Sequence, residues 1–255
     1  MEYFIVAIVS LLASGLTFFS GFGLGTILTP AFVFFMPLEM AIVCTAIVHF
    51  LNGIFKLTLI KQHIQFKILL TFGIPSIVAA FAGGFVLQSL SINNQTIELM
   101  FFNHLFSFQK LNVIVGFLLL FFALFDLLPI FKNLAFDKKF MVLGGFLSGF
   151  FGGLSGHQGA FRSAFLIKAG LEKQAFVATG TAISFFIDLT RLGVYAQLIN
   201  QIKFDIPWMM ISIACFAAFA GAFLGNKYLK KASNSKLQLI VGLSLIAISI
   251  FVIFS

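Results

Sequence analysis

The segment SGFFGGLSGHQG, residues 148–159, interrupts an apolar stretch that extends from residue 140 to residue 168. Five glycines fall within these twelve residues. Because glycine adopts backbone conformations that break a helix, we expect this stretch to be broken rather than to form one straight helix. A similar segment, SGFGLG at residues 20–25, divides the apolar stretch at residues 3–36. The interpretation of the remaining chain begins from these two broken stretches.

The remaining chain is unusually apolar. Hydrophobic residues make up 60% of its 255 residues and charged residues 9%, against roughly 45–50% and about 25% in soluble domains. Polar residues this scarce cannot cover a soluble exterior, so we expect an all-α, polytopic membrane bundle. The helices are expected in eight apolar segments, near 3–36, 40–60, 66–88, 111–131, 140–168, 174–199, 206–228 and 237–254. Residues 91–110 are expected to form an interfacial helix or loop.

The chain contains an internal repeat. At an offset of 134 residues, Ser14 and Gly15 align with Ser148 and Gly149. At an offset of 138, residues 79–85 align with residues 217–223, and six of the seven positions are identical. Self-similarity of this kind indicates a duplicated structural unit. We therefore expect two related halves, residues 1–131 and 140–255, joined by a cytoplasmic linker at 132–139.

The loop lysines predict the orientation of the halves. If all eight segments crossed the membrane, the lysines would divide equally between the two sides. If the two broken segments instead enter and leave on the same side, twelve lysines lie on one side and two on the other, which matches the positive-inside rule. Each half then has three transmembrane helices and a re-entrant hairpin, so the repeats are inverted. The termini are expected outside, with the lysine-rich loops cytoplasmic; these lysines account for the net charge of +8 without a nucleic-acid partner.

Few ionisable residues lie inside the apolar segments, and these follow helical spacing. One polar stripe runs along the second segment and another along the sixth. The first stripe comprises Thr45, His49, Asn52 and Lys56, and the second comprises Thr181, Ser184, Asp188, Arg191 and Tyr195. Charged groups at membrane depth are costly and are commonly functional. We therefore expect both stripes to face the interior of the bundle.

Arg162 follows the second break by about one helical turn and has no nearby acidic residue in the sequence. A guanidinium binds oxyanions through several N–H donors, and helices that begin after a break point free N–H groups at the same place. We therefore expect an anion-binding site. Simpler structural explanations stay open: snorkelling of Arg162 to the interface, a satisfied core role for His157, and a local ion pair of Asp188 with Arg191.

The predicted site collects the polar and glycine residues of both broken segments and their neighbours. The expected substrate-binding residues are Gly21, Gly23, Gly25, Thr45, His49, Asn52, Gly153, Ser155, Gly156, His157, Gln158, Gly159, Arg162 and Thr179. Asp188 and Arg191 are expected to serve in gating or proton coupling. No metal or cofactor is expected, because Cys44 and Cys215 are isolated in apolar runs and are interpreted as packing residues.

These motifs resemble the TauE/SafE sulfite exporter family, and the resemblance covers nearly the whole chain. The first copy of the glycine-rich motif comprises residues 20–25, Pro30, residues 37–41 and Thr45. The second copy comprises residues 148–156, residues 170–175 and Thr179. FAGGF at 81–85 and FAGAF at 219–223 are similar to the small-residue third helix of that family.

The resemblance implies a multi-pass permease of the bacterial inner membrane for small sulfur-containing anions such as sulfite or organosulfonates. Together with the inverted, broken repeats, this favours a secondary transporter that works by alternating access around the two broken helices; export is the expected direction, and import stays open. The polar residues 155–162 make the second half the stronger candidate for substrate binding. The coupling ion, a proton or sodium, is left open, as is assembly into a homodimer.

Other functions are weighed against this prediction. An uncoupled anion channel and a permease for another small anion, such as a carboxylate, both stay open. A carrier that relays thiosulfate through cysteines is weakened by the isolation of the two cysteines. An enzyme is not expected, since the sequence contains no HExxH zinc motif, no GxSxG serine motif and no paired intramembrane carboxylates.

Overall fold

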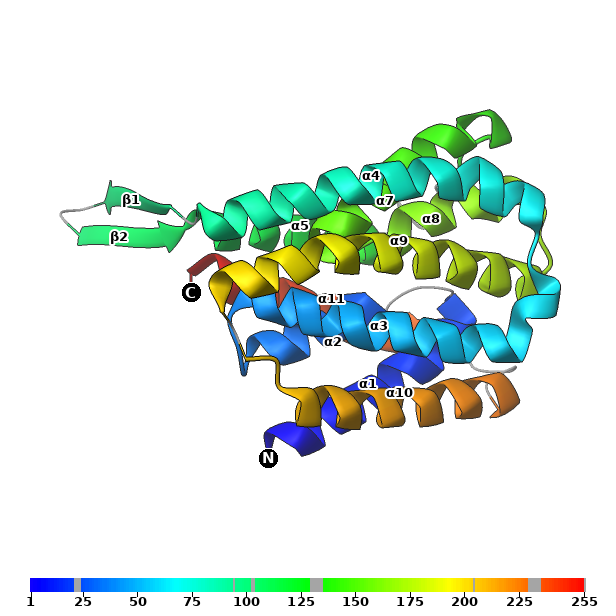
Figure 1. Ribbon diagram of the computed structural model, residues 1–255, viewed down its shortest axis with the longest axis horizontal. Coiled ribbons are helices and arrows are strands. Elements are labelled where there is room, and N and C mark those ends of the chain that lie inside the picture. The colour runs from blue at the N-terminus through cyan, green and yellow to red at the C-terminus, as the bar shows by residue number, and fades with distance from the viewer. Residues whose placement is uncertain are drawn as a thin grey trace.

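The computed structural model describes residues 1–20, 24–93, 95–101, 104–128, 135–203, 205–228 and 235–254, which form a helical bundle with a β-hairpin at one end (Figure 1). Its α-helices are α1 (Glu2–Ser20), α2 (Leu24–Val33), α3 (Leu38–Ile60), α4 (Phe66–Ile92), α5 (Lys110–Leu127), α7 (Met141–Ser155), α8 (Gly159–Leu166), α9 (Lys173–Ile202), α10 (Trp208–Tyr228) and α11 (Ser235–Phe254). Its short 3-10 helices are η1 (Lys61–His63), η2 (Lys138–Phe140) and η3 (Ile167–Ala169). Its strands are β1 (Thr96–Phe101) and β2 (His104–Gln109).

The two broken segments form the helix pairs α1–α2 and α7–α8, as expected. After α7, Gly156 has a φ of 82°, in the left-handed region that favours glycine. Helix α8 then folds back along α7, so closely that a Cβ on Gly144 would overlap the ring of Phe165. Residues 21–23, which connect α1 to α2, lie outside the described residues.

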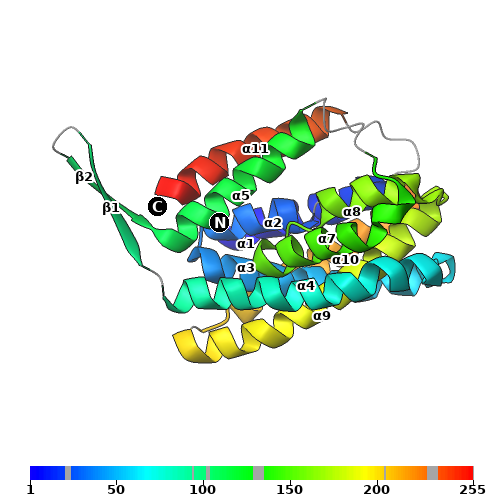
Figure 2. The ribbon, with the colours of Figure 1, turned by 90° about the horizontal axis from the view of Figure 1, so that it is seen from above.

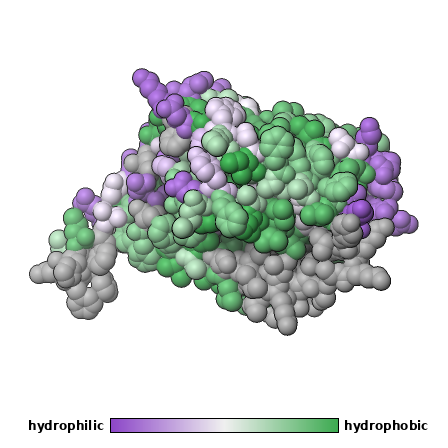
Figure 3. Space-filling view, turned by 90° about the horizontal axis from the view of Figure 1, so that it is seen from below, coloured by the Kyte–Doolittle hydropathy of each residue, from purple (hydrophilic) through white to green (hydrophobic). Residues whose placement is uncertain are grey.

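The helices have the length and the surface of a membrane protein. In the described part of the chain, α3 with η1, α4, α9 and α10 are long and apolar enough to cross a membrane, and the apolar parts of α1, α2, α5 and α11 are shorter. Large apolar side chains face outward, such as Phe66 and Phe216, which are 69% and 73% exposed. Figure 3 shows hydrophobic residues across the middle of one face and hydrophilic residues toward its ends. The chain is a multi-pass membrane protein.

A glycine seam holds α4 against α7. Gly145, Gly149 and Gly153 lie four residues apart on one face of α7 and contact the backbone of α4, where any Cβ would overlap a carbonyl oxygen. Their respective neighbours are Phe72, Ser76 and Ala80 of α4. Small residues allow this close approach in membranes, where van der Waals packing and interhelical hydrogen bonds drive helix association. Helix α1 approaches α10 in the same way at Gly221, which contacts Leu11.

The closest helix pairs join the two halves of the chain. Helix α4 packs along α7, α1 along α10, and α5 along α11. In the sequence alignment of the two halves, α1 corresponds to α7 and α4 to α10. The α4–α7 contact is therefore the counterpart of the α10–α1 contact. A core cluster draws on both halves, with Leu87 and Leu111 from the first and Leu154 and Tyr195 from the second. The halves therefore share a core instead of forming two separate bundles.

The expectation of an interfacial helix or loop at residues 91–110 was wrong, because these residues contain the β-hairpin. Strands β1 and β2 pair antiparallel, with Thr96 opposite Gln109 and Glu98 opposite Ser107. Polar Thr96 and Glu98 alternate with apolar residues, and this period of two is typical of strands. The hairpin extends beyond the bundle in both views (Figures 1 and 2).

The chain connections gather at two ends of the bundle. Both termini lie toward the end that carries the β-hairpin, whereas the α3–α4 connection, η2 and the α8–α9 connection lie at the opposite end (Figures 1 and 2). We call the latter the lysine-rich end, since Lys61, Lys138 and Lys168 lie in its three 3-10 helices. Helices α1 and α2 form a hairpin that starts at the terminal end, and α7 and α8 one that starts at the lysine-rich end.

Replacing Gly149 by alanine should destabilise the protein by about 2 kcal/mol, because overpacking a tight contact costs about 1–3 kcal/mol. The added Cβ would overlap the backbone of Ser76. A backbone atom, unlike the end of a flexible side chain, cannot rotate away from the contact. Gly53→Ala is the matched control, since no atom lies within 4 Å of a Cβ built there. Thermal unfolding of the purified variants in detergent measures the difference; equal melting temperatures would contradict the glycine seam.

Candidate functional site

Asp188 is the centre of a buried polar cluster. Its side chain, on α9, is fully buried, and one oxygen lies 2.5 Å from Nδ1 of His49 on α3. The other oxygen accepts hydrogen bonds from Nε of Arg191 at 3.0 Å and from the amide of Gln158 at 3.3 Å. A carboxylate at this depth requires such partners, because desolvating a charge is costly. Asp188 thus links α3, α9 and the α7–α8 connection.

The second break encloses Arg191. A guanidinium nitrogen of Arg191 donates to the carbonyl of Gly152 at 3.4 Å, and the hydroxyl of Tyr195 donates to the carbonyl of Gly153. The last carbonyls of a helix carry partial negative charge, so a cation and a hydroxyl are suitable donors; the Gly152 carbonyl also accepts the backbone N–H of Gly156 at 3.0 Å. A Cβ on Gly156 would lie 2.7 Å from Nη1 of Arg191. Only glycine fits this position, for space as well as for backbone conformation.

The first broken segment meets the second at Gly25. A Cβ on Gly25 would lie 3.1 Å from the carbonyl oxygen of Gly156 and 3.9 Å from the His49 ring. The start of α2 therefore lies beside both the second break and the Asp188 cluster. Gly21 and Gly23, which were expected to contribute to the site, lie outside the described residues.

Arg162 forms a second buried positive centre, next to the Asp188 cluster. Its guanidinium donates to the hydroxyl of Ser184, which donates to the carbonyl of Gly180 at 3.1 Å. Gly180 leaves room for it, since a Cβ there would lie 3.2 Å from Nε of Arg162. The charges of Asp188 and of Lys56 on α3 both act on Arg162. Two cations from two helices thus share this region.

Lys56 is a candidate functional residue that the sequence-predicted site omitted. Its side chain is only 6% exposed, whereas the lysines that follow it, Lys61 and Lys67, are exposed. The signal was its place as the last member of the polar stripe that includes His49. Among the residues whose burial is described, the buried Lys, Arg, Asp and Glu side chains are Lys56, Arg162, Arg191 and Asp188. Basic side chains outnumber the acidic one, which favours an anion.

His157 and Gln158 lie within the second break. The ring of His157 stacks on Phe122 of α5, with centroids 5.5 Å apart, and its Nδ1 lies 3.2 Å from the Ser155 hydroxyl. Among the described residues, Nε2 of His157 and the amide oxygen of Gln158 are buried and have no hydrogen-bond partner. Unpaired buried polar atoms are costly and call for an explanation. A polar ligand at the break would satisfy them.

The other sequence-predicted residues lie farther from Asp188 or serve packing contacts. Asn52 accepts a hydrogen bond from Ser14 of α1 at 3.1 Å, and Thr179 accepts one from the backbone N–H of Gln65 at 2.9 Å. Thr45 is buried, and Gly153 faces α4 in the glycine seam. Gly159 is buried at the start of α8. The structure thus brings together His49, Gly25, Gly156, Gln158, Asp188 and Arg191.

Metal ligands are not gathered in the part of the chain that the structure describes. No group of three or more His, Cys, Asp or Glu side chains there could hold a metal ion. Cys44 and Cys215 are both buried and free.

The fold and this cluster define a multi-pass membrane protein with a charged site enclosed by broken helices. The chain matches the family model described as Sulfite exporter TauE/SafE over residues 6–252, and it belongs to that family of membrane transporters. The resemblance noted from the glycine motifs is confirmed. No curated protein matches the chain. No solved structure matches it either.

Replacing Asp188 by asparagine should destabilise the fold by about 3 kcal/mol or more, because breaking a buried ion pair leaves a buried charge uncompensated. Arg191 would then face a neutral amide in the bundle interior. Asp205→Asn is the control, since residue 205 is exposed. The comparison uses thermal unfolding in detergent at neutral pH, and a variant as stable as the control would show that Asp188 is not a structural centre.

Proposed function

We propose that this chain is a secondary transporter that exports small sulfur-containing anions, such as sulfite or organosulfonates, by alternating access. Membership of the TauE/SafE family supports anion transport across a membrane. The observation that carries the proposal is the buried Arg162 guanidinium beside the second break, within reach of the charge of Lys56. Two buried cations can replace the water that an anion loses on entering the membrane.

In the proposed site the anion lies between the two breaks. The first N–H groups of α8, from Gly159 onward, have no carbonyl partners earlier in that helix, and the positive end of its dipole favours an anion. Arg162 and Lys56 supply charge, and the Nε2 position of His157 can donate a hydrogen bond. Gln158 is a further proposed ligand; its amide nitrogen donates to Asp188, so turning that amide toward the anion would exchange one acceptor for the other. The remaining proposed ligands are Gly21, Gly23, Gly25, Thr45, His49, Asn52, Gly153, Ser155, Gly156 and Thr179.

The proposed architecture is a pair of inverted repeats, residues 1–131 and 140–255, joined by a cytoplasmic linker at 132–139. Each repeat would contribute three transmembrane helices and one re-entrant hairpin. The paired contacts of α4 with α7 and of α10 with α1 support a two-fold relation. Inverted repeats with broken helices are common in secondary transporters, and their substrate sites lie near the bilayer midplane.

Asp188 and Arg191 are the proposed gating or coupling pair. His49 joins them from α3, and its side chain is 17% exposed whereas Asp188 is fully buried. A movement or a change in charge of the Asp188–Arg191 pair would alter the contact of Asp188 with His49 and thereby the contact between α3 and α9. Either a proton or a sodium ion remains compatible with this role.

Replacing Arg162 by glutamine should lower anion transport by about ten- to a hundredfold, the expected effect of losing a charge-assisted hydrogen bond of 1.5–3 kcal/mol. Flux of sulfite and of a short alkanesulfonate into proteoliposomes measures the loss. Lys168→Gln removes an exposed positive charge and should leave the flux unchanged. Membrane insertion is checked by the yield and elution volume of each purified variant.

The outcomes of this experiment separate the alternatives. Wild-type flux in the Arg162→Gln variant would refute the proposed site. Flux that ignores proton and sodium gradients would identify a channel instead of a coupled carrier. Flux of carboxylates, without flux of sulfur anions, would keep the site and correct the substrate.

The proposed topology is that of a bacterial inner-membrane protein with its lysine-rich end in the cytoplasm. Cysteines introduced at Lys139 and Lys203, on opposite ends of the bundle, should therefore label from opposite sides. A membrane-impermeant thiol reagent added to right-side-out vesicles should modify Lys203→Cys and spare Lys139→Cys until the vesicles are opened. The two native cysteines are buried, which favours a low background. Labelling of both variants from one side would refute this topology.

A further inference from the structure

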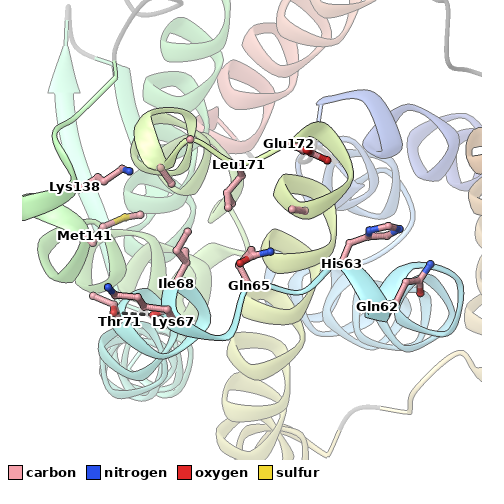
Figure 4. A pocket seen from close by; sticks show the side chains of 13 residues that line it. Gln62, His63, Gln65, Lys67, Ile68, Thr71, Lys138, Met141, Leu171 and Glu172 are labelled. Carbon is pink, nitrogen blue, oxygen red and sulfur yellow. Dashed lines mark hydrogen bonds between the residues drawn. The ribbon is translucent and has the colours of Figure 1, made fainter.

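A pocket opens at the lysine-rich end, away from the Asp188 cluster. Its volume is about 720 Å³, within the range of about 300–1,000 Å³ that is typical of small-molecule sites. It lies where the α3–α4 connection, the start of α7 and the α8–α9 connection meet (Figure 4). Three segments that are far apart in the chain thus line one pocket.

Positive groups outnumber negative ones around this pocket. Lys67 and Lys138 lie on one side of it and His63 on the other, and Glu172 is the acidic residue among those that line it (Figure 4). Helices α4 and α9 both begin at the pocket, and neither Gln65 nor Glu172 makes a side-chain capping bond there. The positive ends of two helix dipoles therefore add to the charge of the two lysines. The combination favours a small anion.

The pocket and the Arg162 region both border α9. Ala175 forms part of the pocket lining, and Thr179 lies one helical turn farther along the same helix. The hydroxyl of Thr179 accepts a hydrogen bond from the backbone N–H of Gln65, which also lines the pocket. The next residue, Gly180, lies against the Arg162 side chain. Along α9, the Gln65–Thr179 contact therefore lies between the pocket and the proposed anion site.

We propose that this pocket is the cytoplasmic vestibule of the transporter, in which Lys67 and Lys138 bind the small oxyanion before it passes the Gln65–Thr179 contact to Arg162. The proposal rests on the proposed function. Charged walls around a concave site raise the local concentration of an oppositely charged substrate. The vestibule thus supplies anion to the buried site, and the contact between α4 and α9 closes it from within.

The positive potential of the vestibule can be measured without transport. A cysteine at Thr71, which lines the pocket and is exposed, reports it through its rates of reaction with an anionic and a cationic thiol reagent of equal size. In Lys67→Gln/Lys138→Gln the ratio of anionic to cationic rates should fall about threefold or more. Lys61→Gln/Lys168→Gln removes the same charge from exposed residues at the same end, and the ratio should change much less. Equal changes in both double variants would overturn the proposal.

Transport tests whether the pocket lies on the anion route. In proteoliposomes of neutral lipid, Lys67→Gln/Lys138→Gln should raise the apparent KM for sulfite about threefold or more when the anion is added at the lysine-rich end. The maximal rate should change little, because both lysines are exposed and neither belongs to the proposed anion site around Arg162. An unchanged KM with a lowered labelling ratio would overturn the vestibule, because the pocket would then concentrate anions without lying on the transport route. Absence of flux in the wild type would instead refute the proposed function, while the labelling ratio still decides whether the pocket concentrates anions.

Discussion

The organisation of the bundle interior depends on the charge of Asp188. A carboxylate in the middle of an apolar bundle is tolerated only if cations and donors reach it. Here those partners come from three places far apart in the chain: His49 on α3, Arg191 on α9 and Gln158 at the second break. Arg191 in turn binds the end of α7. One buried charge therefore fixes the positions of three helices around the break.

The broken helices and the charged residues depend on each other. A break frees carbonyl groups at the end of α7 and N–H groups at the start of α8, and irregular backbone at membrane depth must be satisfied by protein or water. Arg191 and Tyr195 satisfy the carbonyl end. The N–H end, near Arg162, offers donors to an anion. The same interruption of a helix thus generates both the need for internal charges and the place where we propose that an anion binds.

Much of this arrangement could be predicted from the sequence, because glycine clusters mark helix breaks and lipid cannot solvate a polar stripe. The stripes on α3 and α9 placed His49 and Asp188 on inward faces, but spacing along single helices could not show that the two residues meet. Lys56 was left out of the predicted site because it stands near the end of its apolar segment and was counted with the loop lysines. The β-hairpin was missed because its apolar residues were interpreted as membrane-interface residues, although Thr96 and Glu98 alternate as in a strand. Pairing between helices of different halves depends on three-dimensional contacts that no local pattern carries.

The pairing of α1 with α10 has a consequence for biosynthesis. Helix α1 leaves the ribosome first, whereas α10, whose Gly221 it contacts, follows about two hundred residues later. Helix α4 is likewise made before α7, the helix that packs most closely against it. The early helices must therefore stay in the bilayer, with their small-residue faces against lipid or the insertion machinery, until nearly the whole chain has been made. Final assembly of this protein is a late event, and a chain truncated before α10 would leave α1 without its partner.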